Sequence, residues 1–237
     1  FKEEYHIEVI VNTRNIEPIT ETYADSLFAP LLYTDLFTLS QNRGDIDRLE
    51  AASGRAIYSL KTFLSAIDSI IEEGVSQKGW VGIKWHKVPY LRPAEYTTID
   101  AQRAEGCLTR ILRMPAKGGH GWDTSIGFDE MLPFQDYVQH YLIRQALERD
   151  LAIQIHTGQL GGSYGAQISN TKPSHLTDLF LQYPMARFDL LHASFPYTGE
   201  LTALAQLFAN VYINMSWLEV LSPQTAKQCL SDWITSV

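Results

Sequence analysis

The sequence is poor in cysteine and contains no long apolar run. Its two cysteines, Cys107 and Cys229, lie far apart and match no metal-binding spacing. We therefore expect a reduced, cytoplasmic protein, with a single long-range disulfide as the alternative. No segment approaches the roughly 20 apolar residues of a membrane-spanning helix, and the chain does not open on a basic stretch followed by an apolar one, as a secretory signal would. Association with a membrane is not expected.

Clustered positive charge is also missing. The formal net charge is −8 at pH 7, and lysine and arginine occur only singly or in scattered pairs. A surface that binds nucleic acid needs a basic patch or stripe, so nucleic acid is excluded as an expected partner. A small-molecule substrate is the expected partner, and a homo-oligomer is an alternative to the monomer.

The chain begins and ends abruptly. It opens at Phe1 without a methionine and closes at Val237 directly after a helix-like segment, so we expect segments of the full protein to be missing at both ends. It contains no internal repeat and no low-complexity linker. Residues 1–237 are therefore expected to form a single domain.

The first half of the chain gives a mixed pattern. An apolar run predicts a strand at Ile7–Val11, and helical spacing from about residue 45 to 73 predicts one or two long helices, with Gly74 as C-cap. The nearly unbroken apolar run Trp80–Lys84 is typical of a strand buried on both faces. Residues 19–40 and 100–127 give no clear pattern.

The second half alternates regularly between helix and strand. We expect helices at about 128–150, from 172, at 198–208 and at 222–233, and strands at 151–155, 188–191 and 211–215. Such an order demands a parallel sheet with crossover helices, found both in barrels and in open doubly wound sheets. Polar residues follow the successive strands, as at the active-site rim of a barrel: Lys84, His156, His192 and Asn214. We therefore predict an α/β fold of the (β/α)₈ TIM-barrel class.

Two histidines carry the strongest chemical signal. His156 and His192 each follow an apolar strand by one residue, which places both imidazoles at the rim of the sheet. Two neutral imidazoles placed in this way can bind a divalent metal, or one can bind it while the other moves a proton. The alternative is that each histidine only caps its strand and satisfies local backbone groups.

Several short motifs in sequence order resemble the amidohydrolase superfamily. They are residues 152–158, 170–173, 179–184, 187–192, 196–200 and 210–213, together with the earlier strand at 81–84. The similar branch contains the decarboxylases of aminocarboxymuconate semialdehyde type and the amidohydrolase-like domain fused to some glutamine synthetases. The resemblance implies a TIM barrel with a divalent metal, Zn²⁺ first and Mn or Fe as alternatives. By the same resemblance, His156 is a metal ligand and His192 a second ligand or the general base.

Two motifs of the family are missing from the sequence. No His-x-His pair occurs anywhere, and the chain ends before an eighth-strand aspartate could follow. Two protein ligands make a weak site, because catalytic zinc usually has three protein ligands and a water molecule. Either those motifs lie outside this sequence or the protein has lost its metal.

Lys84 is a candidate for both substrate binding and catalysis. Its ammonium group could bind a substrate carboxylate, or its amine could be carbamylated to bridge two metals, as the resemblance suggests. The alternative is a lysine that reaches the rim and pairs with an acid. We expect Trp85, Tyr90 and Trp217 to contact substrate as well, and His86 to be a loop residue rather than a ligand.

A serine-hydrolase motif competes with this interpretation. Residues 161–165 fit the G-x-S-x-G pattern around Ser163, with Asp189 and His192 following in a suitable order. A nucleophile elbow requires the serine directly between a strand and a helix, whereas the predicted strand ends at Ile155 and the next helix begins near residue 172. A loop over the active site is the better interpretation.

The function predicted from the sequence is metal-dependent hydrolysis of a C–N or ester bond in a small carboxylate-bearing substrate. His192 would move the proton. Non-oxidative decarboxylation on the same fold is the nearest alternative, and a barrel retained only for binding is another.

Overall fold

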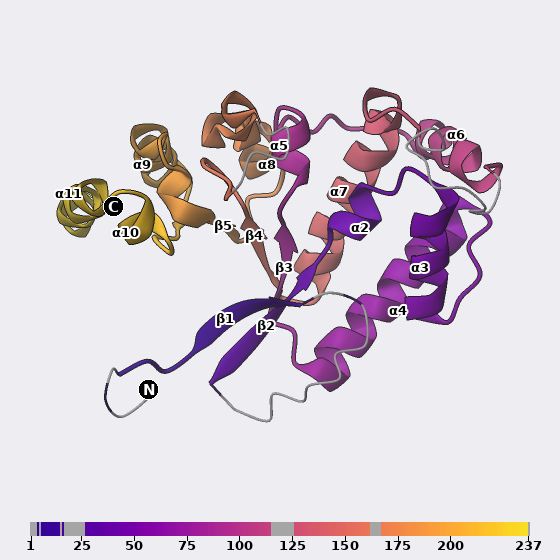
Figure 1. Ribbon diagram of the computed structural model, residues 1–237, viewed down its shortest axis with the longest axis horizontal. Coiled ribbons are helices and arrows are strands. Elements are labelled where there is room, and N and C mark those ends of the chain that lie inside the picture. The colour runs from indigo at the N-terminus through magenta and orange to yellow at the C-terminus, as the bar shows by residue number, and fades with distance from the viewer. Residues whose placement is uncertain are drawn as a thin grey trace. The chain divides into compact units, whose positions relative to one another are not determined.

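The computed structural model of the protein describes residues 4, 6–14, 16, 27–114, 126–161 and 167–236. It shows an α/β fold with a six-stranded sheet whose strand order follows the chain, from β1 to β6 (Figure 1). The residues group into two units, which are described separately below: Phe1–Ile83 with Thr97–Gln145, and Lys84–Tyr96 with Ala146–Val237. No helix of the described residues combines the length and the apolar character needed to cross a membrane.

The first unit begins with two parallel strands, β1 (Ile10–Arg14) and β2 (Phe28–Tyr33). The strand predicted at Ile7–Val11 is therefore shifted, because pairing with β2 begins only where Ile10 lies opposite Phe28. The helices of this part of the chain are α2 (Asp35–Thr38), α3 (Arg43–Ser53), α4 (Leu60–Lys78), α6 (Ala101–Leu112), the short η2 (Asp129–Met131) and α7 (Leu132–Glu148).

Helix α4 runs past its predicted end. Gly74 lies inside the helix, and Gly79, in the left-handed conformation at φ 66°, is the C-cap. A Cβ atom at position 74 would lie 1.8 Å from Cε3 of Trp80. Gly74 is thus a glycine that makes room for an indole ring, and the prediction that it ends the helix is wrong.

The second unit contains the strands that carry the candidate histidines. These are β4 (Ala152–Ile155), β5 (Phe188–Leu190) and β6 (Val211–Ile213), which pair in parallel, beside the carboxyl end of β3 (Gly82–Trp85). The helices are α5 (Val88–Leu91), η3 (Ile168–Thr171), η4 (Pro173–Leu176), α8 (Thr177–Gln182), η5 (Leu191–Ser194), α9 (Thr198–Leu207), α10 (Leu218–Leu221) and α11 (Pro223–Ser236). Figure 1 shows α8, α9 and α11 in succession along one side of these strands. The predicted alternation of helix and strand is confirmed here.

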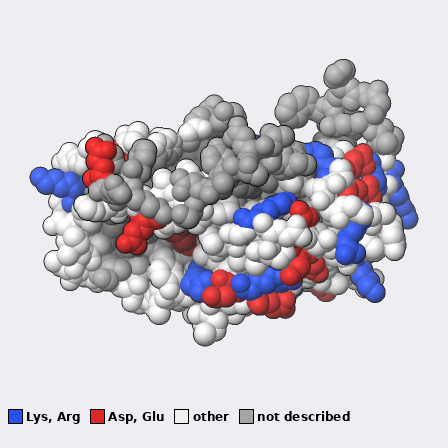
Figure 2. Space-filling model, turned by 90° about the horizontal axis from the view of Figure 1, so that it is seen from below, with Lys and Arg blue, Asp and Glu red and all other residues white. Residues whose placement is uncertain are grey.

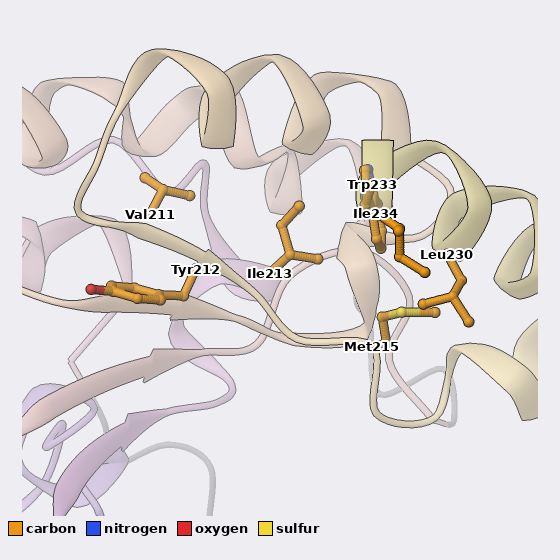
Figure 3. A pocket seen from close by; sticks show the side chains of 7 residues that line it. All are labelled: Val211, Tyr212, Ile213, Met215, Leu230, Trp233 and Ile234. Atoms are coloured by element: carbon orange, nitrogen blue, oxygen red, sulfur yellow. The ribbon is translucent and has the colours of Figure 1, made fainter. Parts of the chain in front are cut away.

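Strand β6 and helix α11 border an apolar hollow of about 360 Å³. Figure 3 shows Met215, after β6, and Leu230, on α11, pointing towards each other across it. The side chain of Trp233 is anchored, because its Nε1 donates a hydrogen bond of 2.7 Å to Oγ1 of Thr202 on α9. Helix α11 is therefore fixed to α9 by a polar contact beside this hollow.

Charges of both signs are distributed over the surface. Figure 2 shows one face of the molecule, on which basic and acidic side chains lie intermingled. On α3, Arg43 forms ion pairs with Asp47 at 2.8 Å and with Glu50 at 2.6 Å. Ion pairs at a protein surface contribute about 0–1 kcal/mol each, so burial of apolar side chains supplies most of the stability.

Candidate active site

A pocket of about 780 Å³ lies in the second unit, at the carboxyl ends of its strands. Three of its lining residues are histidines, and no acidic residue is among the described residues that line it. The lining consists of His86, Lys87, Tyr90, Leu91, His156, Leu160, Gly161, His192 and Trp217. In parallel α/β folds, ligands bind at this edge of the sheet, so the pocket is the candidate active site.

His156 lies at the centre of a row of rings. Its ring centroid is 4.3 Å from that of His192, 4.8 Å from that of His86 and 5.3 Å from that of Tyr90. Its backbone N–H donates to the carbonyl oxygen of Trp85, which ties the end of β4 to the end of β3. Its Nε2 lies 3.3 Å from the carbonyl oxygen of Gln159. Since a carbonyl oxygen only accepts, Nε2 carries the proton and Nδ1 carries the lone pair.

The surroundings of His156 keep its ring neutral. Burial is the main effect, and the charges of Lys84, His192 and His86 add to it, so that the pKa of His156 falls to about 2. The hydrogen bond with the Gln159 carbonyl acts in the opposite direction but is weaker. A neutral imidazole is the form that binds a metal or accepts a proton.

His192 is held in one tautomer. Its Nδ1 lies 2.6 Å from the carbonyl oxygen of Ser216, so Nδ1 donates and Nε2 keeps its lone pair. Burial is again the main cause that lowers its pKa, and Lys84 adds to this effect. The hydrogen bond to Ser216 and the charges of Glu219 and Asp189 oppose it. At neutral pH the ring is thus a fixed, uncharged base.

The backbone at His192 is strained. His192, Ala193 and Ser194 have φ values of 59°, 51° and 52°, so three successive residues that are not glycine adopt the left-handed conformation. Such a conformation costs about 1–2 kcal/mol per residue. This turn has no local sequence signal, because it contains none of the glycines that normally mark left-handed positions.

Lys84 and Trp85 lie beside the pocket rather than in its lining. Lys84 is 4% exposed, and its charge lowers the pKa of both His156 and His192. Trp85 is fully buried and packs against Tyr96 at a centroid distance of 5.6 Å. The roles of Lys84 in catalysis and of both residues in substrate binding therefore stay predictions.

Tyr90 and Trp217 do line the pocket. The hydroxyl group of Tyr90 is buried and has no hydrogen-bond partner among the described residues, and burial raises its pKa. The Trp217 ring packs edge-on against His192 at 5.2 Å and would touch a side chain at Gly161. Both side chains line the pocket, which favours the prediction that they contact a substrate.

Other histidines and Ser163 have different places. His86, predicted to be a loop residue rather than a ligand, lies in the loop after β3 and lines the pocket beside His156. His175 forms an ion pair with Glu95 at 3.0 Å, and His140 is buried on α7. His120 and Ser163 lie outside the described residues, so the serine-hydrolase interpretation stays untested.

The pocket fits a divalent metal only in part. Neutral imidazoles are good ligands for Zn²⁺, and the two neighbouring rings of His156 and His192 provide two of them. However, the part of the chain that the structure describes contains no group of three or more His, Cys, Asp or Glu residues able to hold a metal ion. The described residues therefore do not form a complete metal site.

Comparison with known proteins places the fold. A protein from Lactobacillus casei, provisionally named a metal-dependent hydrolase, superposes on this chain with a TM-score of 0.68 at 16% identity. The match covers 96% of this chain and 56% of that protein. The chain therefore shares its fold with this protein over most of its own length. Uronate isomerase from Thermotoga maritima has a TM-score of 0.64 at 14% identity, over 87% of this chain and 48% of that one. Glucuronate isomerase from Caulobacter crescentus has a TM-score of 0.62 at 14% identity, over 90% and 47%.

Sequence comparison adds a short match. No family model matches the chain. Protein fluG from Emericella nidulans is 36% identical over 84 residues, which are 32% of this chain and 10% of that protein. The chain thus spans about a tenth of that protein and about half of the solved metal-dependent hydrolase and isomerases. The predicted α/β barrel class is confirmed, whereas the amidohydrolase branch stays a prediction.

Proposed function

We propose that this chain is the catalytic barrel of a metal-dependent hydrolase that cleaves a C–N or ester bond in a small carboxylate-bearing substrate. The observation that carries the proposal is the orientation of His192. Its Nδ1 is committed to the Ser216 carbonyl, so Nε2 keeps a lone pair on a neutral ring that lines the pocket. A base within hydrogen-bond reach of a reacting water is what hydrolysis requires.

His192 performs the proton transfers in this proposal. Its Nε2 accepts a proton from the attacking water, whose oxygen forms a bond with the substrate carbonyl carbon. The same nitrogen returns the proton to the leaving nitrogen or oxygen as the C–N or C–O bond breaks. General acid–base catalysis of this kind accelerates reactions by roughly 10²–10⁴-fold.

Positive charge favours a substrate that carries a carboxylate. Lys87 lines the pocket, and Lys84 adds a buried charge near the two imidazoles. Among the described residues, no acidic side chain lines the pocket to repel an anion. The aromatic rings of Tyr90 and Trp217 provide apolar surface for the rest of a small molecule.

A divalent metal belongs to the proposal on the strength of the fold and the resemblance. His156 would be one of its ligands, and Zn²⁺, Mn²⁺ and Fe²⁺ suit imidazole donors. His192 would be a second ligand only in place of its role as base, because its one free lone pair, on Nε2, cannot both bind a metal and accept a proton. Because the described residues offer no third donor in the group, a further ligand must come from residues outside them. The same observation supports a second candidate, a barrel that binds a small molecule without catalysis.

The test is hydrolysis by the full-length protein. A panel of N-acyl amino acids, carboxylate-bearing esters and lactones is assayed with added Zn²⁺ or Mn²⁺, together with His192→Gln and the control His175→Gln, whose histidine pairs with Glu95. We expect hydrolysis that falls about 10²–10⁴-fold in His192→Gln and persists in His175→Gln. Release of CO₂ without hydrolysis would point to the decarboxylase. Specific binding with no turnover would favour the non-catalytic barrel.

A further inference from the structure

The loops that carry His156 and His192 are joined by a buried pair of hydroxyl groups. Oγ1 of Thr157 lies 2.8 Å from Oγ of Ser194 and donates a 3.0 Å hydrogen bond to the carbonyl oxygen of Leu191. Because the one hydroxyl proton of Thr157 is used in that bond, Ser194 must be the donor in the contact between the two hydroxyls. Thr157 is 1% exposed and Ser194 is fully buried.

Backbone contacts bring the same loops together. Gly158 has φ +70°, and a Cβ atom there would lie 2.2 Å from the carbonyl oxygen of Phe195 and 2.5 Å from the carbonyl carbon of Ser194. The N–H of Gln159 donates to the carbonyl oxygen of Phe195 at 2.7 Å. The segment after β4 is therefore packed directly against the left-handed turn after β5.

The turn is fixed on its other side by the segment after β6. The N–H of Ala193 donates to the carbonyl oxygen of Asn214 at 2.8 Å, and Nδ1 of His192 donates to that of Ser216. A left-handed run without glycine persists only where its surroundings over-determine it. The hydrogen bond between the hydroxyl groups of Thr157 and Ser194 belongs to these surroundings, and it links the turn to the loop that carries His156.

We infer that Thr157 and Ser194 are positioning residues, whose buried hydroxyl pair holds the left-handed turn 192–194 and thereby fixes the His192 imidazole relative to His156. The effect on turnover rests on the proposed function of His192, whereas the effect on the ring itself does not. Misplacement of a catalytic group by about 1 Å can cost on the order of 100-fold in rate.

The test compares Thr157→Val, Thr157→Ser and Ser194→Ala in the full chain. The first removes the hydroxyl but keeps the shape of the side chain, the second keeps the hydroxyl, and the third removes only the donor. Thr38→Val is the matched control, because Thr38 is fully buried in the other unit and its hydroxyl donates to the backbone carbonyl oxygen of Asp35. Proton and ¹⁵N NMR of the His192 ring reports its tautomer and the exchange of its Nδ1 proton.

We expect the Nδ1 proton of His192 to exchange about tenfold faster or more in Thr157→Val and Ser194→Ala. Turnover should fall by about 10–100-fold while KM changes by less than about twofold. Thr157→Ser should restore both, and Thr38→Val should lower the melting temperature without changing the ring.

If the ring signals and turnover of Thr157→Val match those of Thr38→Val, the inference is overturned. If the ring is released but the parent protein hydrolyses nothing, the positioning role stands and the proposed function fails. Should Thr157→Val not fold, Ser194→Ala decides by the same readouts.

Discussion

Nδ1 of His192 donates a hydrogen bond of 2.6 Å to the carbonyl oxygen of Ser216. The two residues follow adjacent parallel strands, so a contact between neighbouring loops selects the tautomer of a residue in the pocket. The second nitrogen of the ring is left with its lone pair. This relationship makes His192 the stronger candidate for a proton acceptor, with His156 beside it.

The first prediction concerns stability and pH. Because the folded pKa of His156 lies below its unfolded value of about 6.5, the unfolded chain binds more protons at lower pH. The free energy of unfolding should therefore be fully present above about pH 6.5 and fall by up to about 1.4 kcal/mol per pH unit below it. Urea denaturation between pH 5 and 7.5 should show a shallower slope for His156→Gln than for His175→Gln. Equal slopes in the two variants would contradict the assigned burial of His156.

The second prediction concerns Lys84. Its positive charge lowers the pKa of both His156 and His192, so Lys84→Met should raise both values. NMR titration of the ring carbon protons measures the change directly. Lys87→Met, which changes another lysine that lines the pocket, is the control and should shift the pKa of His156 less. Unchanged pKa values in Lys84→Met would show that the charge of Lys84 does not affect the ionisation of the two histidines.

A third prediction follows from Gly158. The substitution Gly158→Ala places a methyl group against the backbone of Ser194 and Phe195 at a positive φ, and we expect a loss of at least about 2 kcal/mol in the free energy of unfolding. Gly106→Ala is the matched control, because a methyl group on this exposed helix α6 position meets nothing within 4 Å. That change should stabilise the protein by about 0.5–1 kcal/mol. Chemical denaturation of both variants gives the comparison, and a neutral Gly158→Ala would exclude the close approach of the two loops.

The fourth prediction concerns Trp85 and Trp217, which were both predicted from the sequence to contact substrate. Trp217 lines the pocket, so Trp217→Ala should raise KM for a hydrolysed substrate by roughly tenfold, because a ring contact of about 1–1.5 kcal/mol is lost. Trp85 is buried outside the lining, and Trp85→Phe should chiefly lower the melting temperature. Steady-state kinetics and thermal unfolding of both variants test this contrast. The reverse assignment of the two effects would show that Trp85, not Trp217, contacts substrate.

The regular second half of the chain was predictable from sequence because its strands are buried runs that end in polar residues. His156 and His192 were identified for the same reason. Helix α6 was missed although its buried positions, Ala104, Cys107, Leu108 and Ile111, recur at helical spacing and Asp100 caps its first turn. Strand β2 was missed because the residues before it give no turn or strand pattern.

The geometry of the site was less accessible. Neither the left-handed turn at 192–194 nor the Thr157–Ser194 pair has a local sequence signal, since both depend on contacts between loops after different strands. His86 was predicted to be a loop residue rather than a ligand, and it does lie in the loop that follows β3. Its place beside His156 arises from the pairing of β3 with β4, which joins the backbone of Trp85 to that of His156.

The metal content of the full-length protein, purified without chelator, tests the central claim most directly. Plasma mass spectrometry should find about one or two equivalents of zinc, manganese or iron, with the metal lost in His156→Ala and retained in His175→Ala. That result would support His156 and His192 as the centre of a metal-dependent hydrolase. Absence of metal from the parent protein, even after reconstitution with each ion, would contradict this account and favour a barrel that only binds its ligand.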